Sequence, residues 1–372
     1  VTGGNDMRLL PNTTHAEIDN FDGLSLTPTG FKITSGNHLI NPNGTGVVYI
    51  AIRRPDGYVA KPVEDGTKVF GMTYGSADSA TPQFRTPTVD VNDFTLYWQP
   101  ASGGSRYCGS RLLQERYWYT NSNGGTAGDP NEKYDYMNGY GSWTSNATSF
   151  LTYIWKRHAG FDVVTYKGNN TAGSAWSHGL GKVPEMIWIK NIGASADWAV
   201  GHIGLNGGTN PWNYRMLLNS TAVQSAANDY WGGSSNTGKP PTSTHFFLGS
   251  AWTESNANNN EYTAMLFASI DGVSKCGYYD GTGAAGHVIT TGFLPRLLII
   301  KNTTGANSWF LYDTIRGLGS GNDPYMQLEN TNAQASGSGL DVFATSSTGF
   351  TINQNYHSVN ASGQKYIYYA HA

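Results

Sequence analysis

The stretch Val183-Pro-Glu-Met-Ile-Trp-Ile-Lys-Asn191 decides the fold, because the chain repeats its pattern as Leu294-Pro-Arg-Leu-Leu-Ile-Ile-Lys-Asn302. In each case a tryptophan, Trp198 or Trp309, follows the lysine by eight residues. Self-similarity at a fixed period is typical of a chain that repeats one structural unit. The matched landmarks therefore predict a protein built from serial repeats.

Each of these stretches has the residue pattern of a β-strand. In the first, Met186, Trp188 and Lys190 would point to one face of a sheet, and Ile187 and Ile189 to the other. Turn clusters of Gly, Asn and Pro separate such runs, and no window carries the apolar stripe of a long helix. The sequence predicts an all-β fold of half-buried antiparallel strands.

The landmarks divide the chain into four units. Their predicted boundaries are 1–56, 57–158, 159–272 and 273–372. A complete unit of roughly 100–110 residues has the size of one β-sandwich, so we expect serial, jelly-roll-like sandwiches, the second of them divergent. Residues 1–56 match only the C-terminal half of a repeat that ends on a strand at 48–53, and this implies natural polypeptide upstream of Val1.

Composition excludes several classes of protein. Charged residues are 13% of the chain, about half the usual share. The net charge of −3 comes without a basic stripe, so we expect no nucleic-acid partner. The longest apolar runs, such as Leu297–Ile300, are too short to span a bilayer, and we expect no membrane insertion. The two cysteines, Cys108 and Cys276, could form one disulfide bond or remain as two buried thiols. We favour buried thiols because Cys276 lies in a strand-like run.

Three longer stretches carry a resemblance to a known family. They are Ile154-Trp-Lys-Arg-His-Ala-Gly-Phe-Asp-Val-Val-Thr-Tyr-Lys-Gly168, His178-Gly-Leu-Gly-Lys-Val-Pro-Glu-Met-Ile-Trp-Ile-Lys190 and Lys365-Tyr-Ile-Tyr-Tyr-Ala-His-Ala372. They resemble a repeat-containing, tail-fibre-like virion protein family of marine tailed phages, especially cyanophages. The resemblance covers essentially the whole chain and is most specific over 150–372. It implies a virion protein and carries over no catalytic residue.

We expect no catalytic residue, no cofactor and no metal site. The histidines are isolated, and no nucleophile motif has its partners. Asp129, Glu132 and Asp135 gather beside Tyr134 and Tyr136. Such a cluster could supply the acid pair of a glycosidase or bind Ca²⁺. The spacing of a Ca²⁺ loop is missing, and we favour a solvated loop.

Aromatic side chains in loops are the best candidates for contacts with other molecules. Trp198 and Trp309 recur at matched positions, so we expect them to pack inside the fold. The aromatic residues without clear counterparts in the other units are Tyr117, Trp118, Tyr119, Trp143, Trp212, Tyr230 and Trp231. We favour contact with another subunit for these seven, since Tyr and Trp are enriched at interfaces. Buried anchoring of loops and stacking on a glycan are the alternatives.

These observations predict a non-enzymatic structural protein of a phage particle. We expect a tail fibre or surface fibre, a homotrimer in contact with other virion proteins, that contributes to assembly and host attachment. One alternative is a glycan-binding, receptor-binding or adhesin module that contacts a host-surface glycan. The other is a capsid decoration protein.

Overall fold

The computed structural model describes most of the chain and confirms the all-β class. The described residues are 6–8, 10, 14, 16, 18–21, 23–27, 30–36, 40–44, 46–52, 65–77, 81–233, 237–250, 252–337 and 339–372. All strand pairs are antiparallel, and the helical elements are single turns. These turns are η1 (Gly66–Lys68), η2 (Ala147–Ser149), η3 (Leu205–Gly208), η4 (Pro211–Asn213) and α1 (His357–Asn360).

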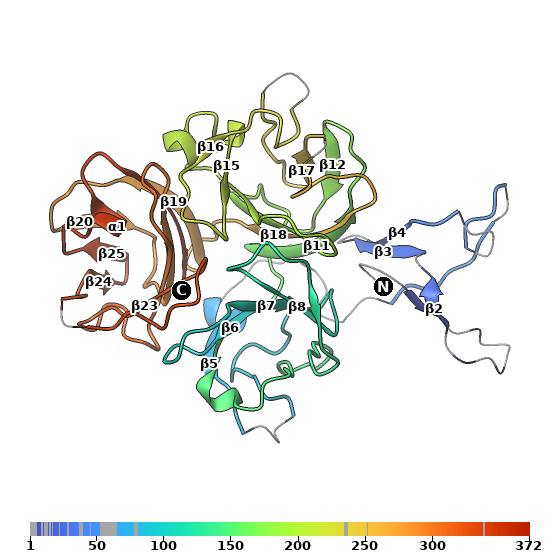
Figure 1. The fold of residues 1–372 in the computed structure, drawn as a ribbon, viewed down its shortest axis with the longest axis horizontal. Coiled ribbons are helices and arrows are strands. Elements are labelled where there is room, and N and C mark those ends of the chain that lie inside the picture. Colours follow the sequence, from blue (N-terminus) through green and yellow to red (C-terminus); the bar gives the residue numbers. More distant parts are fainter. Residues whose placement is uncertain are drawn as a thin grey trace.

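Three large sheets form the body of the molecule (Figure 1). Sheet I consists, in spatial order, of β5 (Phe70–Tyr74), β10 (Leu151–Trp155), β6 (Phe94–Trp98), β7 (Tyr107–Ser110), β8 (Arg116–Tyr119) and β9 (Ala127–Gly128). Sheet II consists of β11 (Phe161–Lys167), β18 (Glu261–Phe267), β13 (Met186–Asn191), β14 (Ala199–His202), β15 (Tyr214–Leu217) and β16 (Ser225–Ala226). Sheet III consists of β19 (Ser274–Asp280), β26 (Lys365–His371), β21 (Leu297–Asn302), β22 (Trp309–Asp313) and β23 (Tyr325–Gln327).

The three sheets share one strand order. In each, the first strand lies at the edge, the last strand of the segment lies beside it, and the remaining strands follow in chain order. The pairing register is also the same, with Phe94, Met186 and Leu297 at equivalent positions opposite the last strand. Each sheet lies inside one predicted unit, 57–158, 159–272 or 273–372. The exact division into these units stays a prediction.

Smaller sheets cover the outer faces of sheets II and III. They are β12 (Ser174–Ser177) with β17 (His245–Leu248), and β20 (His287–Thr290) with β25 (Gly349–Ile352) and β24 (Phe343–Ser346). Each outer face has its own apolar cluster, which contains Ile187 and Ile189 over sheet II, and Leu298 and Ile300 over sheet III. Over sheet I, loop residues such as Phe84 take the place of a second sheet.

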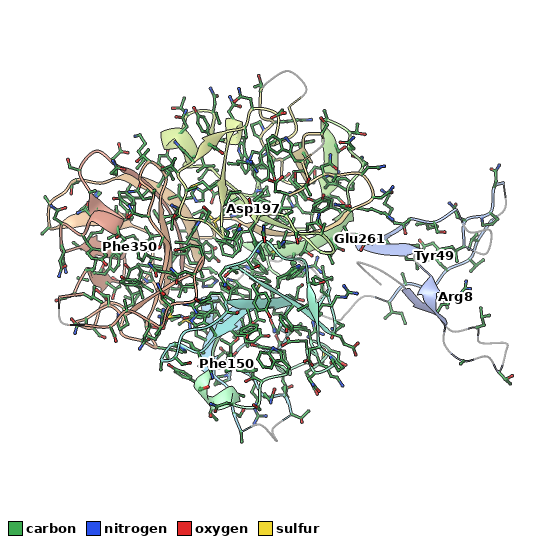
Figure 2. The ribbon with its side chains drawn as sticks, in the orientation of Figure 1. Arg8, Tyr49, Phe150, Asp197, Glu261 and Phe350 are labelled. Carbon is green, nitrogen blue, oxygen red and sulfur yellow. The ribbon has the colours of Figure 1, made fainter. Side chains whose placement is uncertain are left out.

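The inner faces of all three sheets meet in one central core. Its cluster includes Leu96 of sheet I, Trp188 of sheet II and Ile299 of sheet III. The predicted alternation along β13 is confirmed, but the expected half-burial was wrong, because all six of its residues are buried. A strand covered on both faces reads as a continuous apolar run rather than as an amphipathic one. Figure 2 shows side chains filling the space among the sheets.

Matched hydrogen bonds join neighbouring sheets. Trp198 Nε1 donates a hydrogen bond to the backbone oxygen of Tyr119 in sheet I at 2.9 Å. Trp309 Nε1 donates to the Leu217 oxygen of sheet II, also at 2.9 Å. Arg106 Nε completes the cycle, since it donates to Gln327 of sheet III at 2.9 Å. The three sheets are therefore linked in a closed ring within one chain.

A buried cation accompanies each link. Lys190 Nζ donates to Asn123 and Ala196, and Lys301 Nζ donates to Thr221 and Asn307, in both cases to backbone oxygens of two adjoining loops. In sheet I the two residue types are exchanged. Trp98 stands where sheets II and III have lysine, and Arg106 stands where they have tryptophan.

The exchanged Arg106 makes both kinds of contact itself. Besides its bond to Gln327, it donates to the backbone oxygens of Gly104 and Asn332, which lie in the two adjoining loops. Its guanidinium carbon lies 5.8 Å from the centre of the Trp98 ring. Burial lowers the pKa of Lys190 and Lys301 to about 8 and that of Arg106 to about 10.

The N-terminal segment extends from one side of the ring of sheets and touches it at β11 (Figure 1). It forms two hairpins, β1 (Asp6–Arg8) with β2 (Ile18–Phe21) and β3 (Leu24–Thr27) with β4 (Gly30–Ile33). The closing strand expected at 48–53 is not formed over residues 48–52, and Arg53 lies outside the described residues. Val48, Ile50 and Ile52 are 96%, 89% and 93% exposed, because no strand among the described residues pairs with this stretch.

Candidate functional site

An aromatic cluster lies on the outer side of sheet I. Tyr107 is at its centre, with ring centroids 5.2 Å from Tyr119, 5.4 Å from Trp143 and 5.6 Å from Tyr117. The ring centroid of Phe150, the residue directly before β10, is 6.2 Å from that of Tyr107. Tyr107, Tyr117, Tyr119 and Trp143 are only partly buried.

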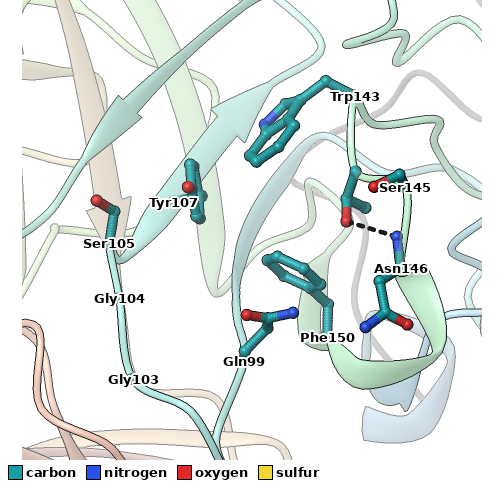
Figure 3. A pocket seen from close by; sticks show the side chains of 10 residues that line it. Gln99, Gly103, Gly104, Ser105, Tyr107, Trp143, Ser145, Asn146 and Phe150 are labelled. Carbon is teal, nitrogen blue, oxygen red and sulfur yellow. Dashed lines mark hydrogen bonds between the residues drawn. The ribbon is translucent and has the colours of Figure 1, made fainter.

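A small pocket opens beside this cluster. Its volume is about 180 Å³. Its lining residues are Gln99, Gly103, Gly104, Ser105, Tyr107, Trp143, Thr144, Ser145, Asn146 and Phe150. Figure 3 shows Tyr107 on one side of the pocket and Trp143 and Asn146 on the other, with Phe150 and Gln99 between them. Two loops far apart in sequence, 99–105 and 143–150, therefore build one site.

Hydrogen bonds hold the polar rim of the pocket. Gln99 Nε2 donates to Ser149 Oγ at 2.7 Å, and Gln99 Oε1 accepts from Ser102 Oγ at 2.9 Å. The backbone nitrogen of Asn146 donates to Thr144 Oγ1 at 3.3 Å, the bond drawn in Figure 3, while the Asn146 side chain is exposed. None of the ten described residues that line the pocket is charged.

Glycine shapes the loop 99–105. Gly103 has a φ of +72°, and a Cβ there would lie 2.5 Å from the backbone oxygen of Thr331. Only glycine combines this left-handed conformation with so close an approach. The next residue, Gly104, donates its backbone nitrogen to the Thr331 oxygen at 2.8 Å. The pocket wall is thus attached to the sheet III segment of the ring.

Glu132 lies behind the aromatic cluster and is fully buried. Its carboxylate accepts hydrogen bonds from Tyr97 Oη at 2.5 Å, Ser142 Oγ at 2.7 Å and Tyr134 Oη at 2.9 Å. Burial raises the pKa of Glu132 to about 7, and the three hydroxyl donors oppose the rise. The favoured solvated loop was wrong for this residue, because the chain folds Tyr97 and Tyr134 over it.

The other acidic residues do not join Glu132. Asp135 is exposed, and Asp129 Oδ1 accepts from the backbone nitrogen of Asn131 at 2.9 Å. In the part of the chain that the structure describes, no group of three or more His, Cys, Asp or Glu could hold a metal ion. The geometry gives Glu132 a packing role, with its carboxylate oxygens occupied by hydroxyls.

Four of the seven predicted contact residues are buried inside the chain. Trp118 lies in the central core, where its ring meets Trp198 edge-on at 6.1 Å. Trp212, Tyr230 and Trp231 pack together in the outer cluster of sheet II. Their expected role in contacts with other molecules is corrected to that of internal anchors, because the chain itself covers their rings. Contact by Tyr117, Tyr119 and Trp143 stays a prediction.

Several residues of the pocket were not predicted from the sequence. Gln99, Tyr107, Asn146 and Phe150 were not among the predicted contact residues, since a single amide or ring in a strand or loop carries no signal of a pocket. One signal was present in the sequence. Where the equivalent strands of sheets II and III end in Lys-Asn, sheet I has Trp98 at the end of its strand and Gln99 directly after it. The proximity of loops 99–105 and 143–150 depends on the pairing of β6 with β10, which no local pattern specifies.

Two further sequence expectations concern the cysteines and the membrane. Cys108 and Cys276 are both free and buried, so the preference for buried thiols is confirmed. Burial raises the pKa of both thiols. Among the described residues, no helix has the length and apolar character needed to cross a bilayer.

Fold and site together define the class: an all-β protein whose three antiparallel sheets surround a common core, with one aromatic, uncharged pocket on sheet I. The chain belongs to the family described as a domain of unknown function, DUF7483, whose model matches residues 137–372. The match includes Trp143, Asn146 and Phe150 of the pocket but not Gln99 or Tyr107. Comparison with curated proteins and with solved structures gave no match.

Proposed function

We propose that this protein is a structural component of a tailed-phage particle, located in the tail or a surface fibre, and that it contributes to assembly and host contact without catalysis. The resemblance of residues 150–372 to tail-fibre-like virion proteins supports the proposed place in a phage particle. The closed ring of three sheets is the observation that carries the mechanical role. Each sheet packs its inner face into the common core and is hydrogen-bonded to the next.

Such a ring suits a part that presents surface. Close-packed interiors have low compressibility and transmit strain, so loops on this frame keep their positions under load. Binding residues of proteins are commonly carried by loops on a rigid scaffold. The pocket beside Trp143 is built from such loops. This pocket favours the alternative of a glycan-binding module. Such a module would also belong to the phage particle, where it would contact the host receptor.

The location is tested on particles of a phage whose genome encodes this chain. We expect its peptides in purified particles by mass spectrometry, and gold-labelled antibody fragments against it on the tail. Label on the capsid shell would support a decoration protein instead. Absence from purified particles would contradict the proposal.

Self-association is tested separately. As a fibre component the chain should form a homotrimer, and light scattering at micromolar concentration should give three times the mass of the 40.2 kDa chain. Because the contacts among sheets I, II and III close within one chain, the trimer would have to form through other surfaces. A monomer with no assembly partner would contradict the fibre.

A further inference from the structure

Sheet I departs from the other two sheets at the end that carries the pocket. The position of Phe150 in sheet I corresponds to Tyr262 in sheet II and Tyr366 in sheet III. Tyr262 stacks on Tyr166, with ring centroids 5.2 Å apart and planes 17° from parallel. In sheet III, Tyr366 stacks in the same way on Tyr279, at 5.0 Å and 11°.

The stacking partner is missing in sheet I. Continuing the register of β5 and β10 places Gly75 opposite Phe150, and the Gly75 nitrogen donates to the Phe150 oxygen at 3.1 Å. Glycine stands where Tyr166 and Tyr279 stand in the other sheets. Phe150 therefore has no tyrosine stacked on it from the first strand.

A second exchange occurs at the neighbouring position. Asn191 and Asn302 are buried in sheets II and III, where their side-chain oxygens accept from backbone nitrogens of the following turn. Sheet I has Gln99 there, and its longer side chain reaches Ser149 at the pocket rim. Sheet I thus replaces both the Tyr–Tyr stack and the Asn-capped turn, and its pocket lies beside the replaced residues.

We propose that this pocket binds one ring of a neutral saccharide. This inference rests on the host-contact role proposed above and names the ligand class of that site. Tyr107, Trp143 and Phe150 supply ring surface against which the C–H-rich face of a sugar can pack. Gln99 and Asn146 supply amides, which donate and accept hydrogen bonds as sugar hydroxyls also do.

The charge and size of the pocket restrict which ligands it can bind. The uncharged lining has no cation to pair with a carboxylate, sulfate or phosphate, so a neutral sugar fits better than an acidic one. The volume of about 180 Å³ is below the roughly 300–1,000 Å³ of pockets for drug-sized ligands, which suits a single ring. A longer glycan would extend from the pocket over Tyr117 and Tyr119.

A second pocket of the same volume offers a matched control. It lies beside the partly buried Trp176 and is lined by Lys32, Lys167 and His245 among others. Its lysines give it a different charge from the pocket at Trp143. A half-buried tryptophan is thus available in each pocket, and removing either ring should perturb the protein to a similar degree.

Saturation-transfer NMR on the full chain tests the proposal with four probes: D-galactose, D-glucose, D-mannose and N-acetyl-D-glucosamine. We expect at least one to bind with a dissociation constant on the order of 1 mM. Trp143→Ala should weaken this binding about tenfold or more, since one lost ring contact of moderate strength has that effect. Asn146→Ala should also weaken it, and as an exposed substitution it should leave the fold intact. Trp176→Ala should leave binding unchanged.

Three results would overturn the inference. They are no saturation transfer from any of the four sugars to a folded protein, binding unchanged in both Trp143→Ala and Asn146→Ala, or loss of binding only in Trp176→Ala. The result of the sugar-binding test can be distinguished from the result of the test for presence in the phage particle. A chain found in the particle that binds none of the sugars would refute the sugar site alone, whereas a sugar-binding chain absent from the particle would refute the phage role alone.

Discussion

Trp309 Nε1 lies 2.9 Å from the backbone oxygen of Leu217, so the last large sheet is hydrogen-bonded to the sheet before it. Trp198 makes the same bond to Tyr119, and Arg106 makes it to Gln327. The three bonds run around a closed cycle in which no sheet is terminal. Because the sheets also share one core, we expect them to unfold together rather than one by one.

The first prediction concerns the tryptophan link. Trp309→Phe removes the donor to Leu217 and keeps an aromatic ring, so it should cost about 1–3 kcal/mol beyond the loss of volume. Trp188→Phe is the matched control. Trp188 is buried in the same core, and its Nε1 has no hydrogen-bond partner among the described residues. Urea unfolding measures both, and equal losses of stability would contradict the role of the bond.

The second prediction concerns the exchanged pair in sheet I. Trp98→Lys would place a second cation beside the buried Arg106, and Arg106→Trp would remove the cation that makes that link. Each single substitution should cost about 3–5 kcal/mol, because it leaves buried polar or charged groups without compensation. The double variant restores the arrangement of sheets II and III. Its loss in free energy of unfolding should be smaller than the sum of the two single losses by about 1 kcal/mol or more. A loss equal to that sum would refute the equivalence of the links.

The third prediction concerns acid. Burial lowers the pKa of His158 and His202 from 6.5 to about 3 and that of His371 well below 6.5. Between these values the unfolded chain binds more protons than the folded one, so stability is full above pH 6.5 and falls as the pH drops. Each histidine adds a slope of about 1.4 kcal/mol per pH unit.

The acid effect is measured by urea unfolding between pH 6.5 and 4.5, a window bounded by the ordinary pKa values of His and Glu. Glu132 acts in the opposite sense there with one proton, against three from these histidines, and burial also lowers the pKa of a fourth, His178. His202→Gln should make the decline shallower by about one proton. Stability that stays constant or increases toward pH 4.5 would show that these histidines are not held neutral.

The fourth prediction concerns Glu132 itself. Its folded pKa of about 7 exceeds the ordinary 4.5, so its contribution to stability is present below pH 4.5 and is lost as the pH rises to 7. Glu132→Gln has no such titration. Its stability relative to the wild type should therefore improve by about 1.4 kcal/mol per pH unit across that window, as followed by thermal unfolding in a series of buffers. A constant difference would mean that Glu132 has an ordinary pKa.

The fifth prediction concerns the thiols. Cys108 and Cys276 lie in the central core with raised pKa values, so neither should react with a thiol reagent while the chain is folded. Labelling should begin only at the urea concentration at which the sheets unfold, and both thiols should appear together. Earlier labelling of one alone would reveal that part of the ring opens independently.

Local sequence determined the strands of this protein and which strands of the different sheets are equivalent. The stretches 183–191 and 294–302 form β13 and β21, and their lysines and tryptophans occupy equivalent positions in the structure. Alternation and β-branched or aromatic content act over a few residues, so they are legible without the rest of the fold. The same patterns indicated an all-β class and the matched role of Trp198 and Trp309 in packing.

Tertiary structure alone decided what covers each strand and which loops meet. Trp118 and Trp231 read as loop aromatics, but the chain buries them, whereas Tyr107 and Phe150 became the walls of a pocket. The exchange of Trp98 and Arg106 is visible in the sequence only once the ring of links is known. The physical reason is that burial and convergence depend on contacts between segments far apart in the chain, and these contacts are set by sheet pairing and by the shared core rather than by local pattern.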